Sequence, residues 1–288
     1  MGKYIKAENY SPMRYPGGKG KLSGYFKELF KQNRLYDCIY FEPYAGGAGV
    51  ALSLLFNQYA QKIVINDFDL SIYALWFSIV NKTEKLCELI SKTKIDINTW
   101  KEMKEINKTE KENILKLGFS TLFLNRTNRS GIINAGVIGG LDQKGTWKID
   151  ARFNKEKIIE RIHRIAKYKH SIEVHNMDAI ELIKTHKLIQ GENSFIYLDP
   201  PYYKKGKDLY LNYYNDDDHK NVLNCLENVS PKKWVVTYDN IEYIKQLYKR
   251  YRVRDYSLSY CAYNYKNGSE IAIYSDSLII PEKITAPI

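Results

Sequence analysis

The sequence over residues 194–203 reads Ser194-Phe195-Ile196-Tyr197-Leu198-Asp199-Pro200-Pro201-Tyr202-Tyr203. Its first half is a short apolar run of residues that favour β-structure, and the two prolines stop that run. The pattern predicts a buried strand that ends abruptly and carries the carboxylate of Asp199 at its tip.

The corner after this strand is rigid and offers only hydrogen-bond acceptors. Asp199 precedes a proline and is held extended, and neither Pro200 nor Pro201 has an N–H group. The Asp199 carboxylate and the Pro200 carbonyl can accept both hydrogens of a nucleobase amine while the base stacks on Tyr202. A plain strand-ending turn with a core tyrosine is the structural alternative.

These acceptors suit methyl transfer to the amine of adenine. That amine is a poor nucleophile because its lone pair is delocalised into the ring. Two fixed acceptors favour the pyramidal nitrogen that forms during attack, so they stabilise the transition state more than the ground state. Alignment with an electrophilic methyl group supplies the rest, and the reaction requires no metal.

The Asp-Pro-Pro-Tyr stretch resembles the catalytic motif of the amino-group DNA methyltransferases, in particular the adenine N6 enzymes. The resemblance implies that Asp199, Pro200, Pro201 and Tyr202 are catalytic, that the target base is flipped, and that S-adenosyl-L-methionine is the cofactor. The implied fold is the α/β class I S-adenosylmethionine-dependent methyltransferase sheet. That sheet is mostly parallel with an antiparallel C-terminal hairpin, and here it carries an inserted, mainly helical DNA-recognition region.

A second segment, Tyr15-Pro16-Gly17-Gly18-Lys19, lies near the N-terminus. The GxxxxGK[ST] spacing is absent, so a nucleoside triphosphate site is not expected. The segment resembles the aromatic-x-Gly-Gly-Lys segment of the Dam-like (D12 class) adenine methyltransferases. By that resemblance Tyr15 contacts the cofactor where the family usually has tryptophan, and Lys19 borders the cofactor and target pockets. A glycine turn that starts a helix is the alternative.

Residues 39–52 form the third informative stretch, an apolar strand followed by a glycine-rich bend and a small-residue helix. Such a bend lets the backbone approach a cofactor closely. Asp67 follows the next apolar strand, where an acid can take the ribose hydroxyls of an adenosine group. These features alone fit NAD as well as S-adenosylmethionine, and the resemblance of Glu-Pro-Tyr-Ala-Gly-Gly to the family's cofactor loop favours the methyl donor. The cofactor-binding residues expected in this loop are Glu42, Pro43, Ala45, Gly46 and Gly47.

Two further acids complete the expected cofactor site. Asp178 follows a predicted strand at 171–174, where family members place an acid that meets the cofactor's adenine amine. Asp178 could equally cap the helix predicted over 179–185. Asp199 is expected to border the cofactor as well as the target base.

Residues 121–140 combine Arg, Asn, Thr and Ser with repeated glycines, and these residue types read base edges and phosphates. The stretch resembles the target-recognition region of the Dam-like group, although its composition also fits an ordinary long polar loop. The expected DNA-binding residues are Asn125, Arg126, Thr127, Asn128, Arg129, Ser130 and Asn134.

The alternation of strands and helices predicts an open α/β sheet with ligands at the carboxyl ends of its strands. A terminal hairpin is expected from residues 253–258 and 271–274. We expect residues 1–81 and 171–288 to form the catalytic, cofactor-binding domain and residues 82–170 to form the inserted target-recognition region.

The net charge of +11 over 288 residues fits a polyanionic partner. No apolar run reaches the length of a membrane span, and the four cysteines lack metal-site spacing. We therefore expect a cytoplasmic monomer that binds duplex DNA and needs neither membrane nor metal. A cognate restriction endonuclease is a partner that the resemblance allows.

Other functions remain open on the sequence. A related enzyme could methylate RNA adenine, cytosine N4 or a protein amide, and Asp rather than Ser or Asn at position 199 argues against the last two. The chain could also be a non-catalytic DNA-binding relative. An NAD oxidoreductase is disfavoured because the GxGxxG spacing is missing.

Overall fold

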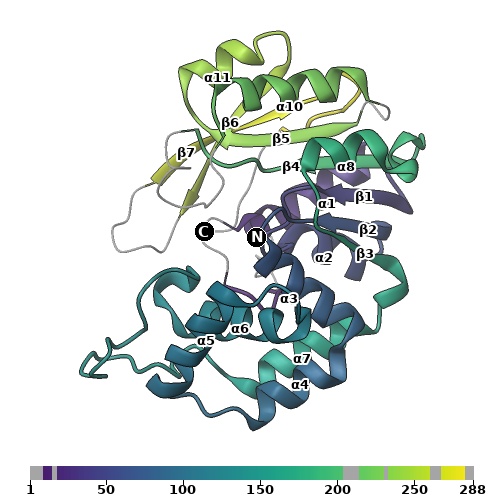
Figure 1. Ribbon diagram of the computed structural model, residues 1–288. Coiled ribbons are helices and arrows are strands. Elements are labelled where there is room, and N and C mark those ends of the chain that lie inside the picture. Colours follow the sequence, from purple (N-terminus) through teal and green to yellow (C-terminus); the bar gives the residue numbers. More distant parts are fainter. Residues whose placement is uncertain (1–8, 15–17, 204–213, 230–232, 260–266, 283–288) are drawn as a thin grey trace, which may run out of the picture. The chain divides into compact units, whose positions relative to one another are not determined.

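A computed structural model describes residues 9–14, 18–203, 214–229, 233–259 and 267–282. Its centre is one seven-stranded sheet with the order β3-β2-β1-β4-β5-β7-β6 (Figure 1). The strands are β1 (Cys38–Glu42), β2 (Ala60–Asn66), β3 (Ile172–His175), β4 (Ser194–Leu198), β5 (Trp234–Asp239), β6 (Arg252–Ser259) and β7 (Asn267–Tyr274).

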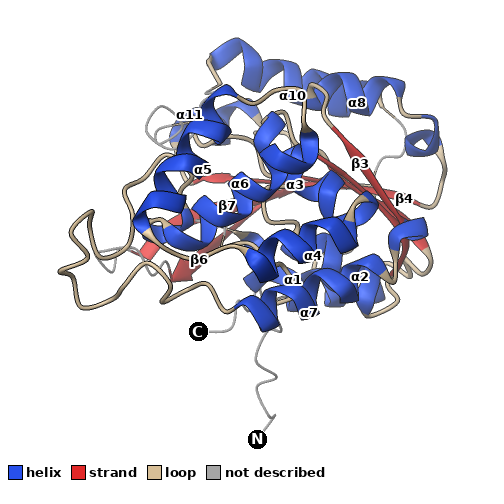
Figure 2. Cartoon of the chain, turned by 60° about the horizontal axis from the view of Figure 1, so that its bottom comes forward, coloured by secondary structure: helices blue, strands red, loops and turns tan. Residues whose placement is uncertain are grey.

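The strand directions confirm the predicted class I methyltransferase sheet. β1 pairs in parallel with β2 and with β4, and β4 pairs in parallel with β5. β7 runs antiparallel to both β5 and β6, which is the predicted C-terminal hairpin. The strands, red in Figure 2, therefore form a mostly parallel sheet with one antiparallel end.

β4 is buried along its whole length because helices cover both faces of the sheet there. Successive side chains of a strand point to opposite faces. Phe195 and Tyr197 stack edge-on against Phe26 of α1 (Ser23–Gln32). Ile196 and Leu198 join the apolar cluster on the other face, to which the helices α8 (Ala179–Thr185) and α10 (Asp216–Asn228) contribute. This double burial explains the uninterrupted apolar run in the sequence.

Short helices connect and flank these strands. Asp178 and Asn215 begin α8 and α10 as N-cap residues, and Asn215 forms a reciprocal capping box with Asp218. The acids at 216–218 thus belong to the first turn of α10. The helices and 3-10 turns of this part are η1 (Lys19–Leu22), α1, α2 (Gly49–Phe56), α8 (Ala179–Thr185), η4 (Lys187–Gln190), α10 (Asp216–Asn228) and α11 (Glu242–Leu247).

The region between β2 and β3 is helical. Gly118 of α6 lies so close to α3 that an added Cβ would come within 2.5 Å of the Ala74 carbonyl oxygen, so the two helices pack backbone to backbone. α7 buries Ile158, Ile162 and Ile165 along one side. The elements are α3 (Leu70–Asn81), α4 (Thr83–Lys92), α5 (Ile97–Thr109), α6 (Ile114–Thr127), η2 (Arg129–Gly131), α7 (Lys155–Ala166) and η3 (Lys169–Ser171).

The contacts divide the chain into two compact units. The first unit consists of residues 1–9, 19–67 and 177–288, and the second, the helical unit, consists of residues 10–18 and 68–176. α3 groups with the helical unit because it packs on α6, although the expected domain boundary lies after it, at residue 82. The assignment of separate roles to the two regions stays a prediction.

Candidate active site

Four parallel strands end at one edge of the sheet and bring polar residues together. Glu42 of β1 lies opposite Ile65 of β2, Phe41 lies opposite Ile196 of β4, and Leu198 lies opposite Val236 of β5. The residues that follow these strands therefore share the carboxyl edge, where open α/β sheets bind ligands. Asp67 follows β2, Asp199 follows β4, and Asp239 is the last residue of β5.

Asp199 directly follows β4, and its two carboxylate oxygens have different surroundings. Oδ1 accepts a hydrogen bond from Thr237 Oγ1 at 2.6 Å and lies 2.9 Å from Lys19 Nζ. Oδ2 accepts from Lys19 Nζ at 3.0 Å. Each carboxylate oxygen has two acceptor positions, and among the described residues only Oδ1 has Thr237 as a second partner beside Lys19, so Oδ2 has fewer partners than Oδ1. The side chain of Asp199 is 22% exposed.

Lys19 supplies the cation of this site from the N-terminal turn η1. Its side chain is buried, and burial alone opposes a charged ammonium. The carboxylates of Asp199 and Glu270 outweigh that effect, so the pKa of Lys19 lies above its ordinary value. Lys19 is therefore charged throughout the physiological range and neutralises part of the negative charge around Asp199.

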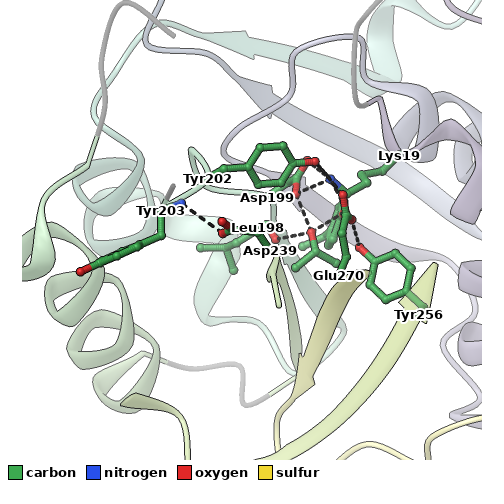
Figure 3. A network of polar contacts seen from close by, with 10 residues as sticks. Lys19, Leu198, Asp199, Tyr202, Tyr203, Asp239, Tyr256 and Glu270 are labelled. Atoms are coloured by element: carbon green, nitrogen blue, oxygen red, sulfur yellow. Dashed lines mark hydrogen bonds and ion pairs between the residues drawn. The ribbon is translucent and has the colours of Figure 1, made fainter. Parts of the chain in front are cut away.

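Tyr202 is fixed by hydrogen bonds at its hydroxyl group (Figure 3). The hydroxyl accepts from Lys19 Nζ at 3.1 Å and donates to Glu270 Oε1 at 2.8 Å. Glu270 Oε2 in turn accepts from the Tyr256 hydroxyl at 2.6 Å. The two prolines before Tyr202 restrict its backbone, so both ends of this residue are held.

The glycine-rich bend after β1 is tied to the end of β2. The Ala45 N–H donates to the Asn66 carbonyl, and the Gly46 N–H donates to Asp67 Oδ2, both at 2.9 Å. Gly46 has a φ of 45°, a backbone conformation that glycine adopts without strain. The Asn66 amide donates to the carbonyl oxygens of Pro43 and Met177, so it joins this bend to the segment before α8. Gly47 lies in the same bend.

Glu42 is a buried acid at the start of this bend. Its carboxylate accepts the Ala51 N–H at 3.0 Å, in the first turn of α2. Burial raises the pKa of Glu42 to about 8, an effect that the backbone hydrogen bond only partly offsets. Glu42 is thus largely protonated at neutral pH and can donate as well as accept a hydrogen bond.

Asp178 acts as a helix cap. Its Oδ1 accepts the N–H groups of Ile180 and Glu181 at 2.9 and 3.1 Å. These contacts of Asp178 agree with its interpretation from the sequence as a helix cap. The expected contact between Asp178 and a cofactor stays a prediction. Tyr15, with Pro16 and Gly17, lies outside the described residues.

Three of the expected DNA-binding residues have structural partners within the helical unit. Asn125 bonds the N–H and C=O of Arg14 at 2.7 and 2.9 Å and the Gly131 carbonyl at 2.8 Å. Asn128 accepts from the Trp100 indole at 2.6 Å, and Thr127 bonds back to its own helix. All three side chains are buried. Asn125 and Thr127 belong to α6 and Asn128 is its C-cap, so these residues form the end of a helix rather than a loop.

The remaining expected DNA-binding residues are more accessible. Arg129, Ser130 and Asn134 are exposed. Arg126 is half-buried, and burial together with the neighbouring arginines lowers its pKa to about 10. These four residues, and not the buried three, are available to a partner from this stretch.

Sequence reasoning did not find three residues that complete the site. Thr237 places a short polar side chain in the apolar strand 234–238. That side chain was the sign in the sequence that position 237 could belong to the site. Glu270 and Tyr256 face each other across the β6–β7 hairpin. The signal for Glu270 was a lone carboxylate just before the apolar run 271–274. A charged side chain is unfavourable in a buried strand.

The fold and the site together define a class I methyltransferase. The family model of the D12 class N6 adenine-specific DNA methyltransferases matches residues 15–261, well over half of the chain. The chain therefore belongs to this family, and the resemblance found in its sequence is confirmed.

Comparisons with solved structures give two similar chains at low identity. The methyltransferase domain of bacterial CtHen1-CN is 8% identical, with a TM-score of 0.39 and coverage of 89% of this chain and 98% of that chain. The rRNA methyltransferase aviRa from Streptomyces viridochromogenes is 11% identical, with a TM-score of 0.37 and coverage of 91% and 86%. Comparison with curated proteins finds no match. Among the described helices, none has the length and apolar character needed to cross a membrane.

Proposed function

We propose that this protein transfers a methyl group from S-adenosyl-L-methionine to N6 of a flipped adenine in duplex DNA. The observation that carries the proposal is the asymmetry of Asp199. Its Oδ1 is held by Thr237 and Lys19, while Oδ2 has fewer partners among the described residues. Membership of the D12 class supports adenine N6 as the acceptor atom.

Asp199 and Pro200 act on the target amine. Asp199 Oδ2 and the Pro200 carbonyl accept the two N6 hydrogens, which favours the pyramidal nitrogen of the transition state over the planar amine. As the N6–C bond forms, N6 becomes positively charged and must lose one hydrogen as a proton. Asp199 Oδ2 is the acceptor for that proton. Pro201 contributes by keeping the corner rigid.

Tyr202 and Lys19 orient the base. The ring of Tyr202 stacks on the flipped adenine, and stacking on an aromatic side chain contributes roughly 1–3 kcal/mol per base. Lys19 holds Asp199 in place by contacting both of its oxygens. The carboxylate is therefore oriented before the base arrives, which avoids reorganisation during the reaction.

The carboxyl edge of the sheet fits S-adenosyl-L-methionine. Asp67 follows β2, as an acid that binds ribose hydroxyls does, and the backbone of Ala45 and Gly46 is held against it. Glu42, Pro43 and Gly47 flank this bend, Tyr15 and Asp178 are further contacts that the family resemblance implies, and Asp199 borders the methyl group. When bound, the cofactor supplies an electrophilic methyl group whose bonding pair stays on sulfur.

The DNA-binding surface is proposed to lie in the region 82–170. The exposed side chains of Arg129, Ser130 and Asn134, with Arg126, are candidates for phosphate and base-edge contacts. The net charge of +11 supports binding to a polyanion. Flipping one adenine costs a few kcal/mol, which phosphate contacts and stacking can offset. A cytoplasmic location, a monomeric state and a partner restriction endonuclease stay predictions.

In the test, purified protein and labelled S-adenosylmethionine are incubated with each of three substrates of mixed sequence: duplex DNA, single-stranded DNA and duplex RNA. Methylated nucleosides are then identified by mass spectrometry. We expect N6-methyladenine with duplex DNA in clear preference to RNA. Methylation of RNA alone would replace the proposal by an RNA adenine methyltransferase. DNA binding without cofactor uptake would indicate a non-catalytic relative.

A further inference from the structure

Glu270 is a buried carboxylate directly before the apolar half of β7. It lies on β7 between Tyr256 of β6 and Asp239 of β5, and it is 2% exposed. The next residues of the strand, Ile271 to Ile273, are apolar core residues. Burial of a carboxylate is unfavourable unless hydrogen bonds and an opposite charge compensate for it. Such a residue therefore requires an explanation beyond the packing of the hairpin.

The partners of Glu270 provide that compensation and lead to the active site. Oε1 accepts from the Tyr202 hydroxyl at 2.8 Å, and Oε2 accepts from the Tyr256 hydroxyl at 2.6 Å. Lys19 Nζ lies 3.5 Å from Oε2 and 2.9 Å from Asp199 Oδ1. One ammonium group is thus shared by two carboxyl groups, one of them Asp199 (Figure 3).

We infer that Glu270 is a positioning residue for methyl transfer, which fixes the ring of Tyr202 and shares the cation of Lys19 with Asp199. The inference rests on the proposed function. Tyr202 has two rotatable side-chain bonds, and a hydroxyl held from both sides restricts them. The plane of the ring sets the plane of the stacked adenine, and so the direction from N6 to the methyl group.

The sharing of Lys19 has a second consequence. Lys19 Nζ lies 2.9 and 3.0 Å from the two Asp199 oxygens and 3.5 Å from Glu270 Oε2, so Asp199 is its nearer partner and the charge of Glu270 offsets part of the ammonium charge. Asp199 therefore keeps its negative charge available to the N6 hydrogens. Without the charge of Glu270, Lys19 would pair with Asp199 alone and weaken Asp199 as an acceptor.

The test compares Glu270→Gln and Tyr202→Phe, singly and combined, in single-turnover methylation with saturating cofactor and mixed-sequence duplex DNA. Cofactor affinity is measured by calorimetry. Glu270→Gln is expected to lower the methyl-transfer rate roughly tenfold to a hundredfold, with cofactor affinity changed by less than about threefold. Because the hydrogen bond between Tyr202 and Glu270 contributes to the effect of both substitutions, the double variant should lose less rate than the product of the two single losses.

Tyr274→Phe is the matched control. Tyr274 lies on the same strand, and its buried hydroxyl bonds Tyr25 at 2.6 Å, outside the contacts of Glu270. The Tyr274→Phe substitution should lower the unfolding midpoint and leave the methyl-transfer rate unchanged. An equal rate loss in Tyr274→Phe would overturn the inference, because a structural role of the hairpin would then explain both.

Two other results would contradict a positioning role: a wild-type rate in Glu270→Gln, or rate losses that multiply in the double variant. If Glu270→Gln does not fold, Tyr256→Phe keeps the carboxylate, removes one of its donors and should still slow methyl transfer. A wild-type rate in Tyr256→Phe would then overturn the inference. Failure of the proposed function looks different, because wild-type protein would then form no N6-methyladenine.

Discussion

Lys19 Nζ lies 2.9 Å from Asp199 Oδ1 and 3.0 Å from Asp199 Oδ2, although the two residues are 180 positions apart in the chain. The contact joins the N-terminal turn η1 to the corner after β4. It converts a carboxylate that the sequence indicates as catalytic into an oriented one. The same ammonium contacts the Tyr202 hydroxyl, so one side chain positions two of the proposed catalytic residues.

Lys19→Met should therefore affect both stability and activity. Removing the ammonium leaves Asp199 and Glu270 without a shared cation, and breaking a buried ion pair in this way costs about 3–5 kcal/mol. Urea unfolding measures this loss, and methylation assays should find activity reduced with it. In the matched variant Lys19→Met/Glu270→Gln one carboxylate is gone, so part of the stability should return. Wild-type stability in Lys19→Met would contradict the ion-pair account.

The pH dependence of stability should carry the signature of Glu42. Burial raises its pKa from 4.5 to about 8 in the folded chain, so the native state binds a proton that the unfolded state releases. The free energy of unfolding should fall as pH rises from about 4.5 to about 8, by an amount on the order of a few kcal/mol.

Glu42→Gln removes this titration. Unfolding midpoints of both proteins at pH 5, 6, 7 and 8 isolate the contribution of Glu42, because other groups titrate alike in the two chains. The wild type should lose stability relative to the variant as pH rises. A constant difference across this range would mean that Glu42 is already ionised in the folded protein.

Two glycines should respond in opposite ways to alanine. A Cβ on Gly49 would lie 2.9 Å from the Cα of Gly20, and this backbone cannot move aside cheaply. Gly49→Ala should therefore destabilise the chain by about 1–3 kcal/mol. Gly24 lies exposed in α1 with nothing within 4 Å of its Cβ position, so Gly24→Ala should stabilise it by up to about 1 kcal/mol. Thermal unfolding of the pair tests the contact between η1 and α2.

The helical unit allows a separation of structural and DNA-contacting residues. Asn125→Ala removes three hydrogen bonds of a buried side chain, two part-buried with Arg14 and one buried with Gly131, so it should cost about 3 kcal/mol of stability. Arg129→Ala removes an exposed cation and should leave the unfolding midpoint unchanged. Arg129→Ala should weaken DNA binding. It should also reduce the slope of log binding constant against log salt concentration by the contribution of about one phosphate contact. Equal loss of stability in both variants would contradict this division.

Local sequence patterns were sufficient for the strands and their ends. The apolar run before Asp199 reported burial on both faces, and the glycines after β1 reported a bend at the carboxyl edge. The expected hairpin of 253–258 with 271–274 is present in the sheet, where its second strand begins earlier, at Asn267. These features depend on residues that are neighbours in the chain.

The rest of the site depends on tertiary contacts that no local pattern contains. Tyr202 and Glu270 are 68 positions apart, and only the sheet order brings β7 beside β5. Composition alone could not identify the role of residues 125–128, because Asn and Thr form helix caps and buried hydrogen bonds as readily as they contact base edges. Asn125 is buried and Arg129 is exposed, and this difference is visible only in the structure.

The most direct measurement follows N6-methyladenine formation by Asp199→Ala beside the wild type. Duplex DNA and labelled S-adenosylmethionine are supplied at saturation, and Asp96→Ala, which removes an exposed helix cap, is the control. Asp199→Ala should bind cofactor and DNA but form no N6-methyladenine above background, while Asp96→Ala should methylate at the wild-type rate. Methylation by Asp199→Ala at the wild-type rate would show that this carboxylate does not act on the adenine amine.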